Sequence, residues 1–117
     1  MAEVTVADGT LWVYLSSVEK VEGVHGDIQI AEADVLEVEA LEKPFEAIHG
    51  WRAPGTGVPG VVAVGTWRDG RRKLFAVLHH GQQAVHVRLK NVSFDELLIG
   101  TADAGRVAAE LRAALGR

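Results

Sequence analysis

The chain has 117 residues, of which 16 are acidic and 12 basic, with a formal net charge of −4 and no cysteine. A chain of this length fits one domain that buries roughly two-thirds of its unfolded surface. The composition excludes disulfides, zinc–thiolate sites, iron–sulfur clusters and a thiol nucleophile, and the charge is not that of a nucleic-acid-binding domain.

The first third of the sequence predicts a hairpin, a helical turn and a further strand. Asp8-Gly9 lies between two runs of β-branched and aromatic residues, which is a hairpin signal. Ser16 and Glu19 have the spacing of a capping box, which predicts a helical turn over 17–22. Strands are expected at 4–6, 11–15 and 27–30.

The next segment, 35–41, alternates with period two. This alternation predicts a strand with Leu36, Val38 and Ala40 on the buried face. Glu37 and Glu39 are then expected on a solvated face, where paired carboxylates do no acid–base chemistry unless burial shifts a pKa. After this strand, Pro44 begins a segment that favours one helical turn before Gly50.

The second half of the sequence predicts more strands and a closing helix. Asp103 is the expected helix cap, and Gly116 the expected stop. The apolar positions of this helix fall on one face: Val107, Ala108, Leu111, Ala114 and Leu115. In the strand at 84–89 the inward residues are expected to be Val85, Val87 and Leu89. The other strands are expected at 61–67, 72–78 and 97–100. We therefore expect seven or eight strands in hairpin order, followed by one helix.

Gly55-Thr56-Gly57-Val58-Pro59-Gly60 has the spacing G-x-G-x-x-G. A dinucleotide site needs a helix after these glycines, because the helix N-terminus holds the pyrophosphate. Here a valine-rich segment follows, and it favours a strand. Pro59 also removes an amide donor, so we expect no nucleotide and no cofactor. Residues 51–60 are expected to form a loop that turns the chain sharply between two sheets.

The segment R-A-P-G-T-G-V-P-G-V-V-A-V-G-T (52–66), with L-S-S-V-E-K (15–20) and H-G-D-I (25–28), resembles a group of small bacterial proteins of pleckstrin-homology-like (PH-like) fold. The resemblance covers most of the chain. It implies a single domain over 1–117, built as a closed barrel of two antiparallel sheets with a C-terminal helix at one open end. It implies no activity and no catalytic residues. The first hairpin has no basic residue, unlike hairpins of this fold that bind phosphoinositides.

No pattern of catalytic or metal-binding residues stands out. The histidines His25, His49, His79, His80 and His86 lack the spacing of a metal motif and are interpreted as scattered turn and surface residues. Ser16, Ser17 and Ser93 lie outside any nucleophile elbow. We therefore expect no catalytic residue and no metal site.

Two clusters and one aromatic pair are candidate interaction sites. The first cluster is a basic hairpin beside Trp67, formed by Arg68, Arg71, Arg72 and Lys73; it could meet an anion or an acidic partner. The second is Trp51 with Arg52, an aromatic–arginine pair typical of interfaces. Trp12 and Tyr14 share a strand face and could form an outward patch covered by a second copy of the chain.

The sequence thus favours a non-enzymatic, cytoplasmic binding module whose partner is a protein or a second copy of the chain. Two alternatives stay open: a small-ligand binder or enzyme at the barrel end near His49, Trp51 and Arg52, and peripheral membrane association through 68–73. The N-terminus lacks the pattern of a signal peptide. The composition of the whole chain, with more arginine than lysine and many alanine, valine and glycine residues, is typical of a GC-rich bacterial genome.

Overall fold

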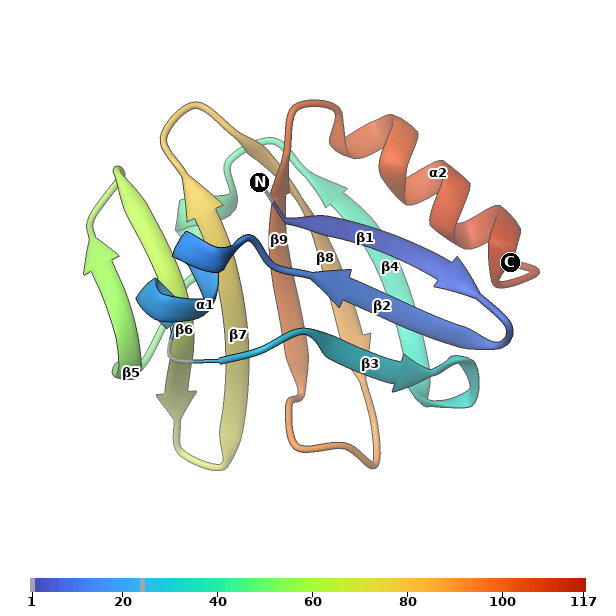
Figure 1. Cartoon of the computed structure of the whole chain (residues 1–117), viewed down its shortest axis with the longest axis horizontal. Coiled ribbons are helices and arrows are strands. Elements are labelled where there is room, and N and C mark those ends of the chain that lie inside the picture. The colour runs from blue at the N-terminus through green and yellow to red at the C-terminus, as the bar shows by residue number, and fades with distance from the viewer. Residues whose placement is uncertain (1, 24) are drawn as a thin grey trace.

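A computed structural model describes residues 2–23 and 25–117, and it is mainly β (Figure 1). The strands of this described part are β1 (Glu3–Ala7), β2 (Thr10–Tyr14), β3 (Ile28–Ala31), β4 (Val35–Leu41), β5 (Trp51–Val58), β6 (Val62–Asp69), β7 (Arg72–His79), β8 (Gln83–Leu89) and β9 (Glu96–Thr101). The helices are α1 (Ser17–Gly23) and α2 (Ala104–Ala114), with 3-10 turns η1 (Glu32–Asp34) and η2 (Pro44–Ala47). Most elements fall where the sequence predicts them, but the described residues form nine strands, and the expected seven or eight is wrong because β5 occupies the segment expected as a loop.

The strands form a three-stranded sheet, β1-β2-β3, and a six-stranded sheet, β4-β8-β9-β7-β6-β5. The expected hairpin order is wrong at two places in the larger sheet. Strand β4 pairs with β8 and lies at the opposite edge from β5, and β9 lies between β7 and β8 and runs parallel to β7. The turn from β7 to β8 must therefore pass the end of β9. Gly100 lies at this crossing: a Cβ added there would collide with the Gln82 side chain and lie 3.0 Å from the Val77 carbonyl oxygen.

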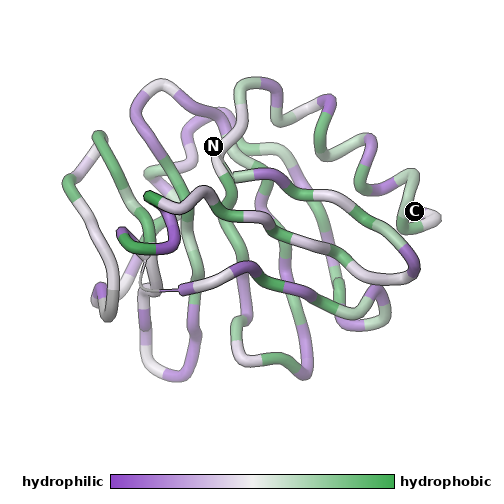
Figure 2. The backbone as a smooth tube through the Cα atoms, in the orientation of Figure 1, coloured by the Kyte–Doolittle hydropathy of each residue, from purple (hydrophilic) through white to green (hydrophobic). Residues whose placement is uncertain are grey.

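The main core lies between the six-stranded sheet and a second layer made of the small sheet and α2. In Figure 1 the strands β1, β2 and β3 run across the larger sheet, and α2 lies beside β1. Where the two layers overlap, hydrophobic segments, drawn in green in Figure 2, recur along the strands of both sheets. Among the core residues, Phe75, Leu97, Val85 and Leu11 are completely buried. This burial of alternate residues on both sheets is what holds the two layers together.

The expected closed barrel is not found among the described residues. The six-stranded sheet ends at β4 and β5, which each pair with one neighbour. Helix α2 packs beside the β4 edge, where Arg112 Nε donates to the Val38 carbonyl oxygen at 2.8 Å. Neither α-helix within residues 2–23 and 25–117 combines the length and the apolar character needed to cross a bilayer.

The prediction for the glycine-rich segment 51–60 is also wrong. The expected sharp loop between two sheets is instead mostly strand β5, which pairs with β6 in the same sheet. Glycine and proline are tolerated there because β5 is an edge strand and the pairing has an irregularity between Arg52 and Gly55. The strand predicted at 61–67 is confirmed as β6. The glycines therefore precede no helix.

Strand β4 is confirmed, and Val38 is buried as predicted, but the predicted burial of Leu36 and Ala40 is wrong. The register shifts between Val35 and Glu37, so that Val35 and Val38 are both buried while Leu36 is 46% exposed and Ala40 is exposed. A bulge adds one residue to a strand and reverses the alternation beyond it. In β8 the inward positions are as predicted, and in α2 all but Ala114 of the predicted apolar positions are at least partly buried.

Both predicted helix caps are confirmed. Glu19 N donates to Ser16 Oγ at 3.1 Å, and Ser16 N donates to Glu19 Oε1 at 2.9 Å. These reciprocal bonds are those of a capping box. At α2, the amide of Arg106 donates to Asp103 Oδ1 at 3.2 Å. These local signals depend only on residues close in the chain.

Candidate functional site

The connection between β4 and β5 crosses one whole face of the larger sheet. These two strands lie at opposite edges of the sheet. The residues that connect them, 42–50, are named the strap. The strap passes over the sheet face turned away from the main core, which is named the outer face. On this face Phe45, Ala47 and Ile48 pack against a second apolar cluster that includes Trp67 and Leu98. The strap divides the outer face into an apolar groove and a row of polar side chains.

The groove lies between the strap and the β5–β6 hairpin, and its volume is about 310 Å³. Its walls are mostly apolar: Phe45 and Ile48 of the strap, Val58 and Val62 of the hairpin, and the ring of Trp67. Pockets for small ligands are typically concave and mostly apolar, with few polar groups, and begin at roughly 300 Å³. The groove is thus of a size and character suited to a small ligand.

Arg52 is the charged residue of the lining. Its Nη1 donates to the Gly57 carbonyl oxygen at 2.8 Å, which holds the side chain across β5. The missing side chain of Gly57 makes this possible, because an added Cβ would lie 2.9 Å from Arg52 Nη1 and 3.3 Å from the Trp67 ring. Among the described residues, Arg52 forms no ion pair with an acidic side chain. It therefore brings an unbalanced positive charge to an apolar groove.

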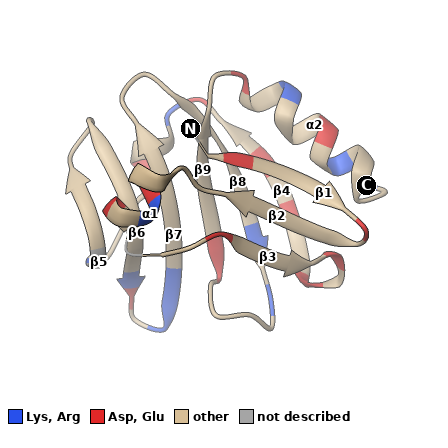
Figure 3. Ribbon diagram, viewed as in Figure 1, with Lys and Arg blue, Asp and Glu red and all other residues tan. Residues whose placement is uncertain are grey.

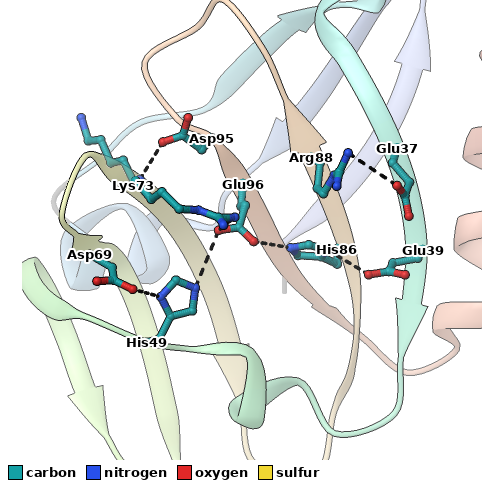
Figure 4. A network of polar contacts seen from close by, with 10 residues as sticks. Glu37, Glu39, His49, Asp69, Lys73, His86, Arg88, Asp95 and Glu96 are labelled. Carbon is teal, nitrogen blue, oxygen red and sulfur yellow. Dashed lines mark hydrogen bonds and ion pairs between the residues drawn. The ribbon is translucent and has the colours of Figure 1, made fainter.

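The polar row centres on Glu96 at the start of β9, whose side chain is 9% exposed (Figure 4). Glu96 Oε1 lies 2.8 Å from His86 Nε2, and Glu96 Oε2 lies 3.0 Å from Arg72 Nη2. The other ring nitrogen of His86, Nδ1, lies 3.2 Å from Glu39 Oε1. His86 thus lies between the carboxylates of the two strands that flank β8.

His49, at the end of the strap, joins this row. Its Nδ1 lies 2.9 Å from Asp69 Oδ2, and its Nε2 lies 3.9 Å from Glu96 Oε2. The strap is therefore held by apolar packing in its middle and by a polar contact at its end.

Burial raises the pKa of Glu96, but the hydrogen bond with His86 and the positive charge of Arg72 lower it by more, so that this pKa lies below its usual range. Glu96 therefore stays ionised through the neutral range. Within the described residues, no cluster of histidine, aspartate and glutamate side chains has the arrangement of a metal site. The row resembles a structural network of ion pairs more than a centre that activates a substrate.

The predicted basic hairpin does not form one patch, although its residues gather at one end of the sheet (Figure 3). Arg72 pairs with Glu96 on the outer face. Lys73 lies over the ring of Phe94, with Nζ 4.8 Å from its centroid. Arg68 and Arg71 are exposed. Trp67, expected beside these cations, is instead only 7% exposed, and its ring lines the groove.

Trp51 and Arg52 are adjacent in β5, but their side chains belong to different surfaces. Trp51 is 84% exposed and does not line the groove, whereas Arg52 does. The expected outward pair is present: the rings of Trp12 and Tyr14 stack with centroids 5.6 Å apart on the solvent side of the small sheet. Trp51 therefore belongs to a different surface from the stacked pair of Trp12 and Tyr14.

Sequence reasoning interpreted the histidines as scattered and missed that two of them meet. His49 and His86 both contact Glu96. The others are apart: His25 packs on Phe75 and Phe94, His79 lies 3.8 Å from Glu22, and His80 faces the Gly60 carbonyl oxygen. One sequence signal could have predicted the contact of His86 with a carboxylate, because Glu39 and His86 alternate with apolar residues on facing strands.

Glu37 and Glu39 are partly exposed as predicted. Glu37 pairs with Arg88, and Glu39 contacts His86.

Comparison of the chain with protein-family models, with curated proteins and with solved structures gave no match.

Proposed function

We propose that this protein is a non-catalytic binding module that takes a small, mostly apolar ligand in the groove between the strap and the β5–β6 hairpin. The groove itself is the observation that carries this proposal, since the described residues that line it are mostly apolar and include one cation, Arg52. It is the small-ligand alternative of the sequence analysis, moved from a barrel end to the outer face of the sheet.

The chemistry of the two halves of the outer face supports binding without catalysis. The described residues that line the groove include no nucleophile and no carboxylate. The carboxylates and imidazoles of the polar row contact one another, and that row holds the strap that forms one wall of the groove. The polar row thus holds the strap in place and, through it, one wall of the groove.

The proposal includes membership of the PH-like group, a bacterial source and a cytoplasmic location. Two packed sheets followed by a C-terminal helix support the resemblance. The parallel pairing of β7 with β9 departs from it. The dispersed cations of the 68–73 hairpin give little support to membrane association, because they face different surroundings.

A matched pair of substitutions tests the groove. Val58 and Val61 are neighbouring exposed valines, at 49% and 52% exposure, but Val58 lines the groove and Val61 does not. We expect small apolar fragments detected by ligand-observed NMR to bind the natural protein and Val61→Trp, and to be lost with Val58→Trp. Fragments that bind Val58→Trp as well as the natural protein would place binding elsewhere.

Self-association is a second candidate, favoured by the exposed stack of Trp12 on Tyr14. A stable dimer of this kind buries roughly 1,200 Å² or more in total. Light scattering of the natural protein and of Tyr14→Asp, at concentrations up to the micromolar range, tests it. A monomeric natural protein would exclude this candidate without touching the groove.

A further inference from the structure

Building on the proposed function, we propose that the ligand class of the groove is a single-chain amphiphile with one carboxylate, about eight carbons long. Its carboxylate would bind Arg52, and its chain would lie along Phe45, Ile48 and Trp67. Charge, size and shape each support this choice.

The charge argument starts from Arg52. A guanidinium has five N–H donors, and among the described residues Arg52 donates one hydrogen bond, to the Gly57 carbonyl oxygen. That bond fixes the side chain across β5 beside the groove before any ligand arrives. A planar guanidinium matches a carboxylate with two parallel hydrogen bonds. One cation balances one negative charge, which favours a carboxylate over the doubly charged phosphate of a monoester.

The size argument starts from the volume of about 310 Å³. At roughly 30 Å³ for each water-sized group, this volume holds roughly ten non-hydrogen atoms, the number in octanoate. Because the other side chains of the lining are mostly apolar, a second polar group on the ligand would find few side-chain partners there. The ligand should therefore be polar at one end only.

The shape argument concerns where the guanidinium of Arg52 lies in the groove. Its Nη1 reaches the Gly57 carbonyl oxygen, one residue before Val58. The Trp67 ring lies beside the same glycine, since a Cβ added at Gly57 would be 3.3 Å from Trp67 Cζ2. A chain whose carboxylate is anchored there would extend between the Trp67 ring and the strap residues that line the groove.

The test is an NMR titration with octanoate and, as the uncharged match, 1-octanol. Ligands of about ten atoms bind with a Kd of roughly millimolar at ordinary efficiency, which this method measures. The variants are Arg52→Gln and the control Arg68→Gln, an exposed arginine of the same sheet that does not line the groove. Thermal unfolding of each variant checks that the fold is kept.

We expect the natural protein and Arg68→Gln to bind octanoate about tenfold more tightly than octanol. Arg52→Gln should lose this preference and keep its affinity for octanol. Equal binding of acid and alcohol by the natural protein would overturn the carboxylate and leave the groove standing. Failure of both compounds to bind in the groove would overturn the ligand class and the proposed function together.

Discussion

Glu96 is the residue whose replacement should reveal most about the outer face. The substitution Glu96→Gln keeps the shape of the side chain and removes its charge. Glu96 is buried to 7% exposure and contacts His86 at 2.8 Å and Arg72 at 3.0 Å. We expect the substitution to weaken the fold at pH 7 because Arg72 and the His86 ring lose the carboxylate that both contact.

The magnitude follows from the two contacts. A hydrogen bond to a charged group contributes about 1.5–3 kcal/mol, which applies to the contact of the Glu96 carboxylate with the buried His86. The Arg72 side chain is 59% exposed, so its contact with Glu96 adds at most about 1 kcal/mol. We therefore expect Glu96→Gln to lower the free energy of unfolding at pH 7 by about 2–3 kcal/mol.

The pH dependence has a definite sign. Because the pKa of Glu96 is lower in the folded protein than in the unfolded chain, its contribution is present above the unfolded value of about 4.3. That contribution is lost as the pH falls through the lower, folded value. The difference between the natural protein and Glu96→Gln should therefore shrink as the pH falls below about 4.

Urea denaturation at pH 7 and at acidic pH measures both effects. The matched control is Glu110→Gln, because Glu110 pairs with Arg106 on the surface of α2 with both side chains at least 60% exposed; this pair contributes about 0.5 kcal/mol or less. The reasoning fails if Glu96→Gln costs no more than the control, or if its cost at pH 7 persists unchanged in acid.

Four further substitutions probe the fold, the first three by their stability and the last by self-association. Gly100→Ala should cost about 1–3 kcal/mol by overpacking against Gln82, whereas Gly26→Ala, with nothing within 4 Å of the new methyl group, should change stability by at most about 0.5 kcal/mol. Ser16→Ala should cost about 1 kcal/mol by removing the α1 cap. Thermal unfolding measures all three. Arg112→Met should free the Val38 carbonyl oxygen and increase self-association through the β4 edge, seen by light scattering; a variant that stays monomeric would contradict this role.

The parts of the fold that the sequence predicted depend on neighbouring residues. The capping box of Ser16 and Glu19, the Asp103 cap and the hairpin at Asp8-Gly9 each involve residues a few positions apart, and all three are present. The mispredicted parts depend on distant pairing. No local signal in 96–101 says that this strand inserts between β7 and β8, and the bulge in β4 is set by its pairing with β8.

The candidate site was predicted only in fragments for the same reason. Arg52 was singled out beside Trp51, but its neighbour in the groove is Trp67, fifteen positions away in the chain. Glu96 draws partners from three other segments, at 49, 72 and 86. The strap brings these together by crossing the sheet from edge to edge, and a strand order with β4 and β5 at opposite edges could not be read from alternation alone.

The most direct test of the central claim is to map the NMR chemical-shift changes of the backbone amides and of the tryptophan indole N–H groups during titration with octanoate. The account predicts that the largest changes lie in the strap near Ile48, at Gly57 and Val58, and at the Trp67 indole. The absence of changes there, or changes confined to the small sheet around Trp12, would contradict the claim that this groove is the binding site.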